Sequence, residues 1–260
     1  MIESIRWATP DERREQILAY LRDRDRTSVA DLSQIFNVSE VTMRKDLDLL
    51  ESQGLLKRVH GAAVVSGRGR LEMYFAAREQ MNLEAKRRIA QAALRYISPH
   101  QNIFLDASTT AFQISRLLKD HGDLTVVTNG LYTALELSCC ADITVIVVGD
   151  LVRRHSSSLV GGLSQDLIQR LHVDIAFFGA RGITPQAGLT ETDIHEAQLK
   201  QRMVRAADTV IGVADATKFG TAYLNSFALP EEIDRIITDS SVDAQTVKEF
   251  RDSQIEIDIV

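Results

Sequence analysis

The sequence predicts an α/β protein with two domains: a small, mostly helical N-terminal domain and a larger C-terminal domain built on a mainly parallel sheet. A chain of 260 residues has room for two domains of ordinary size. From about residue 100 onward, short apolar runs rich in β-branched residues alternate with helical patterns, which is typical of a parallel sheet covered on both faces. Residues 66–70 form a break rich in glycine and arginine. We therefore expect domains at residues 8–65 and 81–260, joined by a linker at 66–80.

Short helices are expected in the N-terminal domain. The first begins near Pro10, because proline suits the first position of a helix. Ser28 and Ser39 have the side chain of an N-cap and precede the second and third helices. In the third helix, apolar residues recur at helical spacing and predict a buried face, formed by Met43, Leu47 and Leu50.

A β-hairpin is expected after the third helix. Residues 55–61 predict a strand that ends in a glycine turn, and residues 62–65 predict the returning strand. Two short helices at a sharp turn followed by a hairpin form the winged helix-turn-helix pattern, in which the third helix enters the major groove of DNA. The spacing alone also allows a protein-binding module of three helices with a solvated charged face.

The residues expected to contact DNA lie at helix caps, on the third helix and on the wing. Arg44 and Lys45 can reach base edges or phosphates, and Thr42 is short enough for a direct contact. The net charge of −6 does not argue against DNA, because residues 1–70 hold 12 Lys/Arg against 11 Asp/Glu and the acidic excess lies beyond them. The full expected set is Ser28, Ser39, Val41, Thr42, Arg44, Lys45, Lys57, Arg58 and His60.

The motif VSEVTMRKDL at residues 38–47, with RVHGAA at 58–63, closely resembles the DNA-binding domain of the DeoR/GlpR family of bacterial sugar-metabolism regulators. That family has a small residue, a threonine, two mostly basic residues and an aspartate at these spacings in the third helix, and all are matched. Ala62 stands where the family has a glycine, a departure confined to the wing turn. The resemblance implies binding to double-stranded operator DNA, usually as a repressor.

The C-terminal domain is expected to hold buried strands at residues 102–106, 124–128, 143–149, 173–179, 209–214 and 235–238, with a further edge strand at 254–259. A helix is expected at 83–96, before the first strand. Further helices fill the gaps between the strands, at 111–119, in a stretch that ends at Cys139 and most clearly at 194–207. Ligands of such sheets bind beyond the carboxyl ends of the strands. The polar loops that follow the strands are therefore the candidate ligand site.

These polar loops favour an anionic ligand. Asp106 and the run Ser108-Thr109-Thr110 lead into a helix N-terminus, whose free N–H groups and dipole suit a phosphate. A Ser-Thr-Thr run at a helix start is more often plain capping, but polar sets recur after several strands, including a loop expected at 188–191. The complete expected set is Asp106, Ser108, Thr109, Thr110, Thr128, Asn129, Gly130, Arg181, Gly188, Thr190, Glu191, Asp215 and Lys218.

Residues 80–240 also resemble the effector domain of the DeoR family, through strings such as FLDASTT at 104–110, DIAFFG at 174–179 and DATKFG at 215–220. That domain is similar to ribose-5-phosphate isomerase and to CoA-transferases, and in regulators it binds phosphorylated sugars. Ala107-Ser108 stands where the family commonly has Ser-Gly, so a side chain replaces a glycine in the expected phosphate loop. The resemblance implies a sugar-phosphate sensor that forms a homo-oligomer, either a dimer or a tetramer.

Two functions are compatible with these observations. The first is a repressor of a carbohydrate-metabolism operon, released from DNA by a phosphorylated sugar. The second is a sugar-phosphate isomerase or transferase with a fused DNA-binding domain, in which Asp106, Glu191, Glu196, Asp215 and Lys218 would supply acid–base chemistry. We expect the first, a protein that is not an enzyme, because these side chains can equally orient ligand hydroxyls and pair with a phosphate.

We expect no cofactor and no metal, since the histidines lack partners at metal-ligand spacing and the two cysteines, Cys139 and Cys140, are adjacent. The N-terminus has no apolar signal segment, and no run approaches the roughly 18 apolar residues of a membrane helix. The sequence therefore predicts a cytoplasmic protein with no membrane partner.

Overall fold

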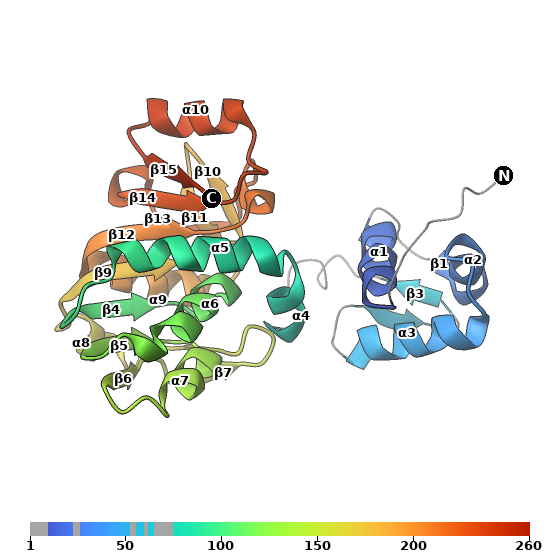
Figure 1. The fold of residues 1–260 in the computed structure, drawn as a ribbon, viewed down its shortest axis with the longest axis horizontal. Coiled ribbons are helices and arrows are strands. Elements are labelled where there is room, and N and C mark those ends of the chain that lie inside the picture. Colours follow the sequence, from blue (N-terminus) through green and yellow to red (C-terminus); the bar gives the residue numbers. More distant parts are fainter. Residues whose placement is uncertain (1–9, 23–26, 53–55, 60–61, 65–74) are drawn as a thin grey trace. The chain divides into compact units, whose positions relative to one another are not determined.

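The computed structural model describes residues 10–22, 27–52, 56–59, 62–64 and 75–260, and the chain divides into two compact units, residues 1–78 and 79–260 (Figure 1). The last residues of the expected linker form a short helix, α4 (Phe75–Gln80). None of the helices in the described part of the chain has the length and apolar composition of a transmembrane segment.

The described N-terminal unit contains the expected helices, α1 (Pro10–Arg22), α2 (Val29–Ile35) and α3 (Glu40–Ser52). The Oγ of Ser28 caps α2 by accepting the N–H of Asp31 at 3.0 Å. The Oγ of Ser39 accepts the N–H of Thr42 at 3.1 Å at the start of α3. Each hydroxyl satisfies an N–H that the first helical turn cannot, so the sequence-based assignment of both caps is confirmed.

The wing is also present. Strands β2 (Lys57–Val59) and β3 (Ala62–Val64) pair antiparallel, and a two-residue strand, β1 (Thr27–Ser28), adds to β3 to give the order β1-β3-β2. β1 was not expected, because two polar residues carry no strand periodicity. The expected wing residue His60 lies outside the described residues.

A buried ion pair accompanies the apolar core of this unit. The core includes Ile17 of α1 and Met43 and Leu47 of α3, all fully buried. On the same side of α3, Oδ2 of Asp46 lies 2.6 Å from Nε of Arg13, which is buried as well. The pair joins α1 to α3 and holds the third helix in place.

The C-terminal unit is built on a seven-stranded parallel sheet with the order β15-β14-β12-β9-β4-β5-β6. Its strands are β4 (Asn102–Leu105), β5 (Leu124–Thr128), β6 (Ile143–Val147), β9 (Val173–Phe178), β12 (Ala207–Val213), β14 (Arg235–Thr238) and β15 (Glu256–Ile259). All the strands expected from the sequence are found, and β15 is an edge strand as predicted. The expected fold class is confirmed.

Helices cover both faces of this sheet (Figure 1). Alternate residues of β4 point to opposite faces, so Ile103 and Leu105 pack in one core and Phe104 in the other. The first core takes up α5 (Leu83–Ala93) and α6 (Thr109–Leu117), and the second takes up α9 (Ile194–Arg205). The remaining helices are α7 (Leu131–Leu137), α8 (Gln165–Ile168) and α10 (Ala244–Asp252), with 3-10 turns η1 (Leu94–Tyr96), η2 (Leu118–Asp120), η3 (Ala216–Lys218) and η4 (Pro230–Glu232).

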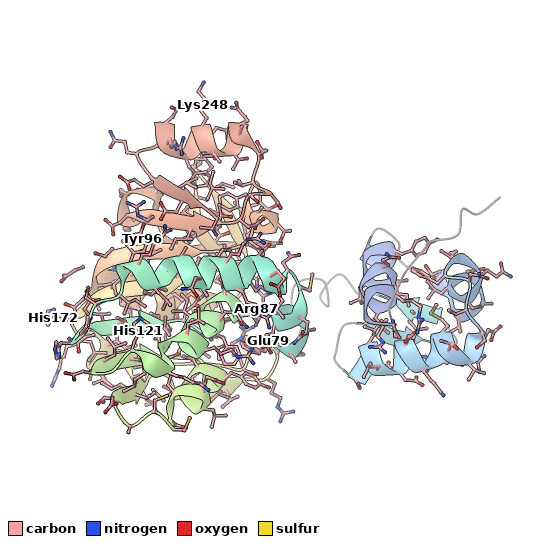
Figure 2. The ribbon with its side chains drawn as sticks, in the orientation of Figure 1. Glu79, Arg87, Tyr96, His121, His172 and Lys248 are labelled. Carbon is pink, nitrogen blue, oxygen red and sulfur yellow. The ribbon has the colours of Figure 1, made fainter. Side chains whose placement is uncertain are left out.

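The edge strand β15 is tied to the helical layer by a polar contact. Tyr96, at the end of η1, donates a hydrogen bond from its hydroxyl to the carboxylate of Asp258 in β15 (Figure 2). Partial burial and this hydrogen bond raise the pKa of Tyr96 above its ordinary value. The phenol therefore stays protonated and keeps donating through the physiological pH range.

Two smaller sheets were not expected. β10 (Gly182–Thr184), β11 (Gly188–Glu191) and β13 (Asn225–Ala228) form an antiparallel sheet, and β7 (Leu151–Arg153) pairs with β8 (Ser158–Val160) as a hairpin. The prediction that residues 188–191 form a loop is therefore wrong. Its Gly-Leu-Thr-Glu sequence has little strand character, but the main-chain pairing with β10 and β13 makes it the central strand of its sheet.

Candidate functional site

The candidate ligand site lies where the strand order of the parallel sheet reverses. From β4 the chain runs outward to β5 and β6, then returns to β9 on the other side of β4 and continues outward to β12 and β14. In open α/β sheets, ligands bind at the carboxyl ends of the strands at such a reversal. The loops there begin at Asp106, after β4, and at Gly179, after β9.

The carboxylate of Asp106 connects these two loops by hydrogen bonds. Its Oδ1 accepts the N–H of Ser108 at 2.9 Å, and its Oδ2 accepts the N–H of Gly179 at 3.0 Å. The side chain is fully buried and also lies 2.9 Å from the Nζ of Lys200. Both carboxylate oxygens of Asp106 are therefore engaged by groups of the protein itself.

Lys200 is the cation at the centre of the site, and the sequence did not indicate it. It is 2% exposed, and its Nζ contacts Oε1 of Glu191 at 2.7 Å and the carbonyl oxygen of Gly179 at 2.9 Å. Burial alone would lower the pKa of Lys200, but the carboxylates of Asp106, Glu191 and Glu196 raise it above its ordinary value. Its ammonium group is therefore charged and balances carboxylates that would otherwise be buried without a counterion.

The loop after β4 leads into the N-terminus of α6, where the sequence predicts an anion site. The Oγ of Ser108 accepts the N–H of Ala111 at 3.1 Å and so caps α6, whose first residues are Thr109 and Thr110. Ser108 lies directly against Gly179, since a Cβ placed on that glycine would come within 2.4 Å of the Ser108 Cβ. The N-terminus of α6 and its dipole point to the edge of the sheet, as expected from the sequence.

The loop after β5 supports the loop after β4. Oδ1 of Asn129 accepts the N–H of Ala107 at 3.1 Å, and its Nδ2 donates to the carbonyl of Leu159 at 3.1 Å. Oγ1 of Thr128 accepts the N–H of Gly130 at 3.0 Å. All three predicted residues of this loop are buried.

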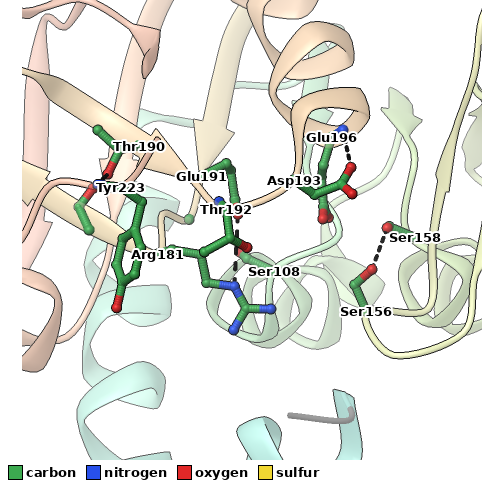
Figure 3. Close-up of polar contacts among 12 residues, drawn as sticks. Ser108, Ser156, Ser158, Arg181, Thr190, Glu191, Thr192, Asp193, Glu196 and Tyr223 are labelled. Atoms are coloured by element: carbon green, nitrogen blue, oxygen red, sulfur yellow. Dashed lines mark hydrogen bonds and ion pairs between the residues drawn. The ribbon is translucent and has the colours of Figure 1, made fainter. Parts of the chain in front are cut away.

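Charged side chains gather around Glu191 and the start of α9, among them Arg181, Asp193 and Glu196 (Figure 3). The Nε of Arg181 lies 3.8 Å from Oε2 of Glu191. Arg153, from the β7–β8 hairpin, forms ion pairs with Glu196 and, at 3.4 Å, with Asp193. Burial and the neighbouring Glu191 raise the pKa of Glu196, although Lys200, Arg153 and Arg181 act in the opposite direction.

The remaining predicted ligand residues lie on two further elements. Thr190, in β11, is fully buried, donates to the carbonyl of Gly182 at 2.9 Å and accepts the N–H of Tyr223 at 3.0 Å. Gly188 begins the same strand and is buried. Asp215 is buried at the end of β12, where it caps η3 by accepting the N–H of Thr217 at 3.1 Å. Lys218, in η3, is half-buried.

The predicted ligand residues thus fall into two groups. Ten of the thirteen are buried: Asp106, Thr109, Thr110, Thr128, Asn129, Gly130, Gly188, Thr190, Glu191 and Asp215. Ser108, Arg181 and Lys218 are partly exposed. We expect a ligand to meet the second group together with the N–H groups at the start of α6.

The candidate DNA interface is on α3. Val41, Arg44 and Lys45 are exposed there, and Thr42 Oγ1 lies 2.9 Å from Ser39 Oγ. Arg44 pairs with Glu40 at 2.8 Å one helical turn earlier. Arg58, on the wing, pairs with Asp48 of α3, and its N–H donates to Glu51.

The two units and their candidate sites define a DNA-binding transcriptional regulator with a ligand-sensing domain. Residues 13–68 match the DeoR-like helix-turn-helix domain, and residues 81–240 match the DeoR C terminal sensor domain. The chain belongs to the DeoR family of transcriptional regulators.

Full-length relatives agree with this family. The chain is 36% identical to the HTH-type transcriptional regulator GolR of Listeria innocua serovar 6a, over 96% of this chain and 98% of the relative. It is 34% identical to a putative aga operon transcriptional repressor of Escherichia coli O157:H7, over 96% and 93% of the two chains. Among solved structures, a D-ribose-5-phosphate isomerase in complex with phospho-erythronic acid is similar over 53% of this chain and 54% of the isomerase, with 20% identity and a TM-score of 0.41.

Proposed function

We propose that the protein represses a carbohydrate-metabolism operon. A phosphorylated sugar binds where the strand order of the sheet reverses and lowers the affinity of the protein for operator DNA. The observation that carries this proposal is that Gly179, two residues before Arg181, lies directly against Ser108 at the start of α6. N–H groups at a helix start and a guanidinium group are suited to phosphate oxygens.

A thermal-shift panel tests the ligand class. Each phosphorylated sugar is paired with its unphosphorylated parent, because a ligand of the folded state raises the melting temperature. We expect phosphorylated members alone to raise it. Equal shifts from a sugar and its phosphate would contradict a phosphate site.

Lys218→Ala is expected to weaken binding of the best phosphorylated sugar. A hydrogen bond to a charged group contributes about 1.5–3 kcal/mol, which corresponds to a roughly 10- to 100-fold loss of affinity. Titration calorimetry measures this loss. Lys248→Ala, at an exposed lysine of α10, is the matched control (Figure 2). If Lys218→Ala and Lys248→Ala bind the phosphorylated sugar with equal affinity, Lys218 does not contact the ligand.

We propose that the site senses its ligand without converting it. Glu191 and Lys200 are paired with each other at 2.7 Å in a buried cluster, so neither is poised to move a proton to or from a ligand. Turnover of ribose 5-phosphate at an ordinary enzymatic rate would argue for an isomerase instead. We place the regulator in the cytoplasm, where it would meet operator DNA.

We infer that a second copy of the chain covers the segment 147–167 of the C-terminal unit. Five of the thirteen exposed large apolar side chains of the described residues lie in this stretch: Val147, Leu151, Val152, Leu163 and Leu167. The segment starts in β6, an edge strand of the sheet. A two-fold axis would pair such a patch with itself, and dimers present two recognition helices to adjacent half-sites of an operator.

Leu151→Asp is expected to convert the oligomer to a monomer, because a dimer would bury two unpaired carboxylates. Light scattering after size exclusion measures the mass. Ile259→Asp, at an exposed residue of the opposite edge strand β15, is the control and should leave the mass unchanged. An unchanged mass for Leu151→Asp would place the interface elsewhere.

A further inference from the structure

The turn between α4 and α5 contains an asparagine in an unusual role. Asn82 occupies the N-cap position of α5, but its backbone is left-handed, with φ 51° and ψ 36°, and its side chain makes no capping hydrogen bond. An asparagine at this position ordinarily has an extended backbone and accepts an N–H of the first turn. Here its Nδ2 donates instead to Oδ1 of Asp215 at 3.1 Å, from 133 residues away in the sequence. The side chain is therefore committed to a tertiary contact and not to its own helix.

Asp215 connects this contact to the candidate ligand site. It is buried at the carboxyl end of β12, and the same Oδ1 accepts the N–H of Thr217 at the start of η3. η3 contains Lys218, one of the partly exposed cations at the site. One oxygen of Asp215 therefore contacts both Asn82 and the start of η3.

A second contact holds the same turn. Oε1 of Glu79, in α4, lies 3.1 Å from Nη1 of Arg116, in the last turn of α6 (Figure 2). α6 begins at the Ser108 loop. The guanidinium group of Arg116, near the end of this helix, also packs on the ring of Phe112. The turn at 79–82 is thus attached to two elements, η3 and α6, that both start in candidate ligand loops. The chain N-terminal to α4 leads to the DNA-binding domain.

We propose that Asn82 is a positioning residue that transmits the ligand state of the Asp215 loop to the turn at 79–82, and through α4 to the segment that joins the two domains. The inference rests on the proposed function, since it needs a ligand at the sheet edge. A ligand changes DNA affinity only when its binding differs between two conformations, and the resulting coupling is reciprocal. The Asn82–Asp215 hydrogen bond is the contact that would differ.

Asn82→Gly tests this role. Glycine adopts a left-handed backbone freely, so the variant removes the side-chain contact and keeps the turn. Gln254→Gly is the matched control, because Gln254 is exposed, lies in the same unit and has φ 65°. Asn82→Asp is a second variant of nearly the same size, which places a carboxylate opposite Asp215 and cannot donate.

The measurement is the affinity for a duplex that the wild-type protein selects from a random pool, with and without saturating inorganic phosphate at constant ionic strength. In the wild type and in Gln254→Gly we expect phosphate to weaken DNA binding by about 5- to 150-fold, the usual range of such coupling. In both Asn82 variants we expect phosphate to change the DNA affinity by less than twofold. Phosphate should still raise the melting temperature of these variants, and their DNA affinity without phosphate should equal that of the wild type. A merely structural role would instead change the melting temperature or both affinities.

Three results would overturn the inference, and they are distinguishable. A wild-type response to phosphate in both Asn82 variants would show that Asn82 does not transmit the ligand state. A thermal shift in the wild type without any change of DNA affinity would refute the coupling itself. No thermal shift of the wild type by phosphate would contradict the proposed ligand site, and this inference with it.

Discussion

Replacing Arg44 and Lys45 together with alanine is expected to lower the affinity for operator DNA by roughly 30-fold or more, because each side chain that reads a base contributes about 1–3 kcal/mol. Both residues are exposed on α3. The Arg44–Glu40 pair is exposed on both sides, and such surface pairs contribute little to stability. The melting temperature should therefore stay within a few degrees of the wild type.

A gel-shift titration against a duplex selected from a random pool measures the affinity. Arg87→Ala is the matched control, since Arg87 is also an exposed helical arginine, paired at 2.6 Å with Glu84 one turn earlier. It lies in the C-terminal unit and should leave DNA binding unchanged. Wild-type affinity of the double variant would move the DNA-reading surface away from α3.

Replacing Lys200 with methionine is expected to lower the free energy of unfolding by about 3–5 kcal/mol, the cost of leaving buried charges without their partner. Asp106 and Glu191 would both lose the ammonium group that lies within 2.9 Å of each. A shape-matched apolar side chain cannot replace the hydrogen bond to Gly179 either. Urea unfolding, monitored by circular dichroism, measures the change.

Two comparisons make the Lys200 result specific. Lys248→Met removes an exposed lysine of α10 and should change the free energy of unfolding by less than about 0.5 kcal/mol. Adding Glu191→Gln to Lys200→Met should restore part of the loss, because one buried carboxylate is then neutral. The single variant should also become relatively more stable as the pH falls, since an unpaired buried carboxylate has a raised pKa and its proton favours the folded state. An unaffected free energy of unfolding would show that the cluster is not a structural requirement.

The parallel sheet was predictable because its central strands, such as β4 and β9, are buried and form continuous apolar runs in the sequence. The small sheet of β10, β11 and β13 could not be predicted. Gly182–Thr184 and Gly188–Glu191, which form β10 and β11, are short and partly polar, and β11 pairs with the distant strand β13. Tertiary contacts, not local propensity, decide such strands.

The sequence predicts which loops form the candidate site, but it does not indicate the buried Lys200 at its centre. Glu196 and Lys200 are four residues apart on a helix, a spacing that usually indicates an exposed pair. Only the packing of α9 against β11 and the end of β4 turns Lys200 inward, next to Asp106 and Glu191. Asn82 carries the signal of a helix cap, and only the fold shows that Asp215 takes its side chain instead. Arg13 and Asp46 are likewise paired by the meeting of two helices.

The strand order has a consequence for the order in which the protein is made. β4, with Asp106 at its end, leaves the ribosome before β9, and the N–H of Gly179 that Asp106 accepts comes 73 residues later. At synthesis rates of about 5–20 residues per second, this interval is several seconds. In this interval β4, β5 and β6 can already pair, while the edge of β4 that later pairs with β9 is still open and the Asp106 carboxylate is hydrated. The candidate ligand site is therefore completed only when β9 and the residues after it pack on the first half of the sheet.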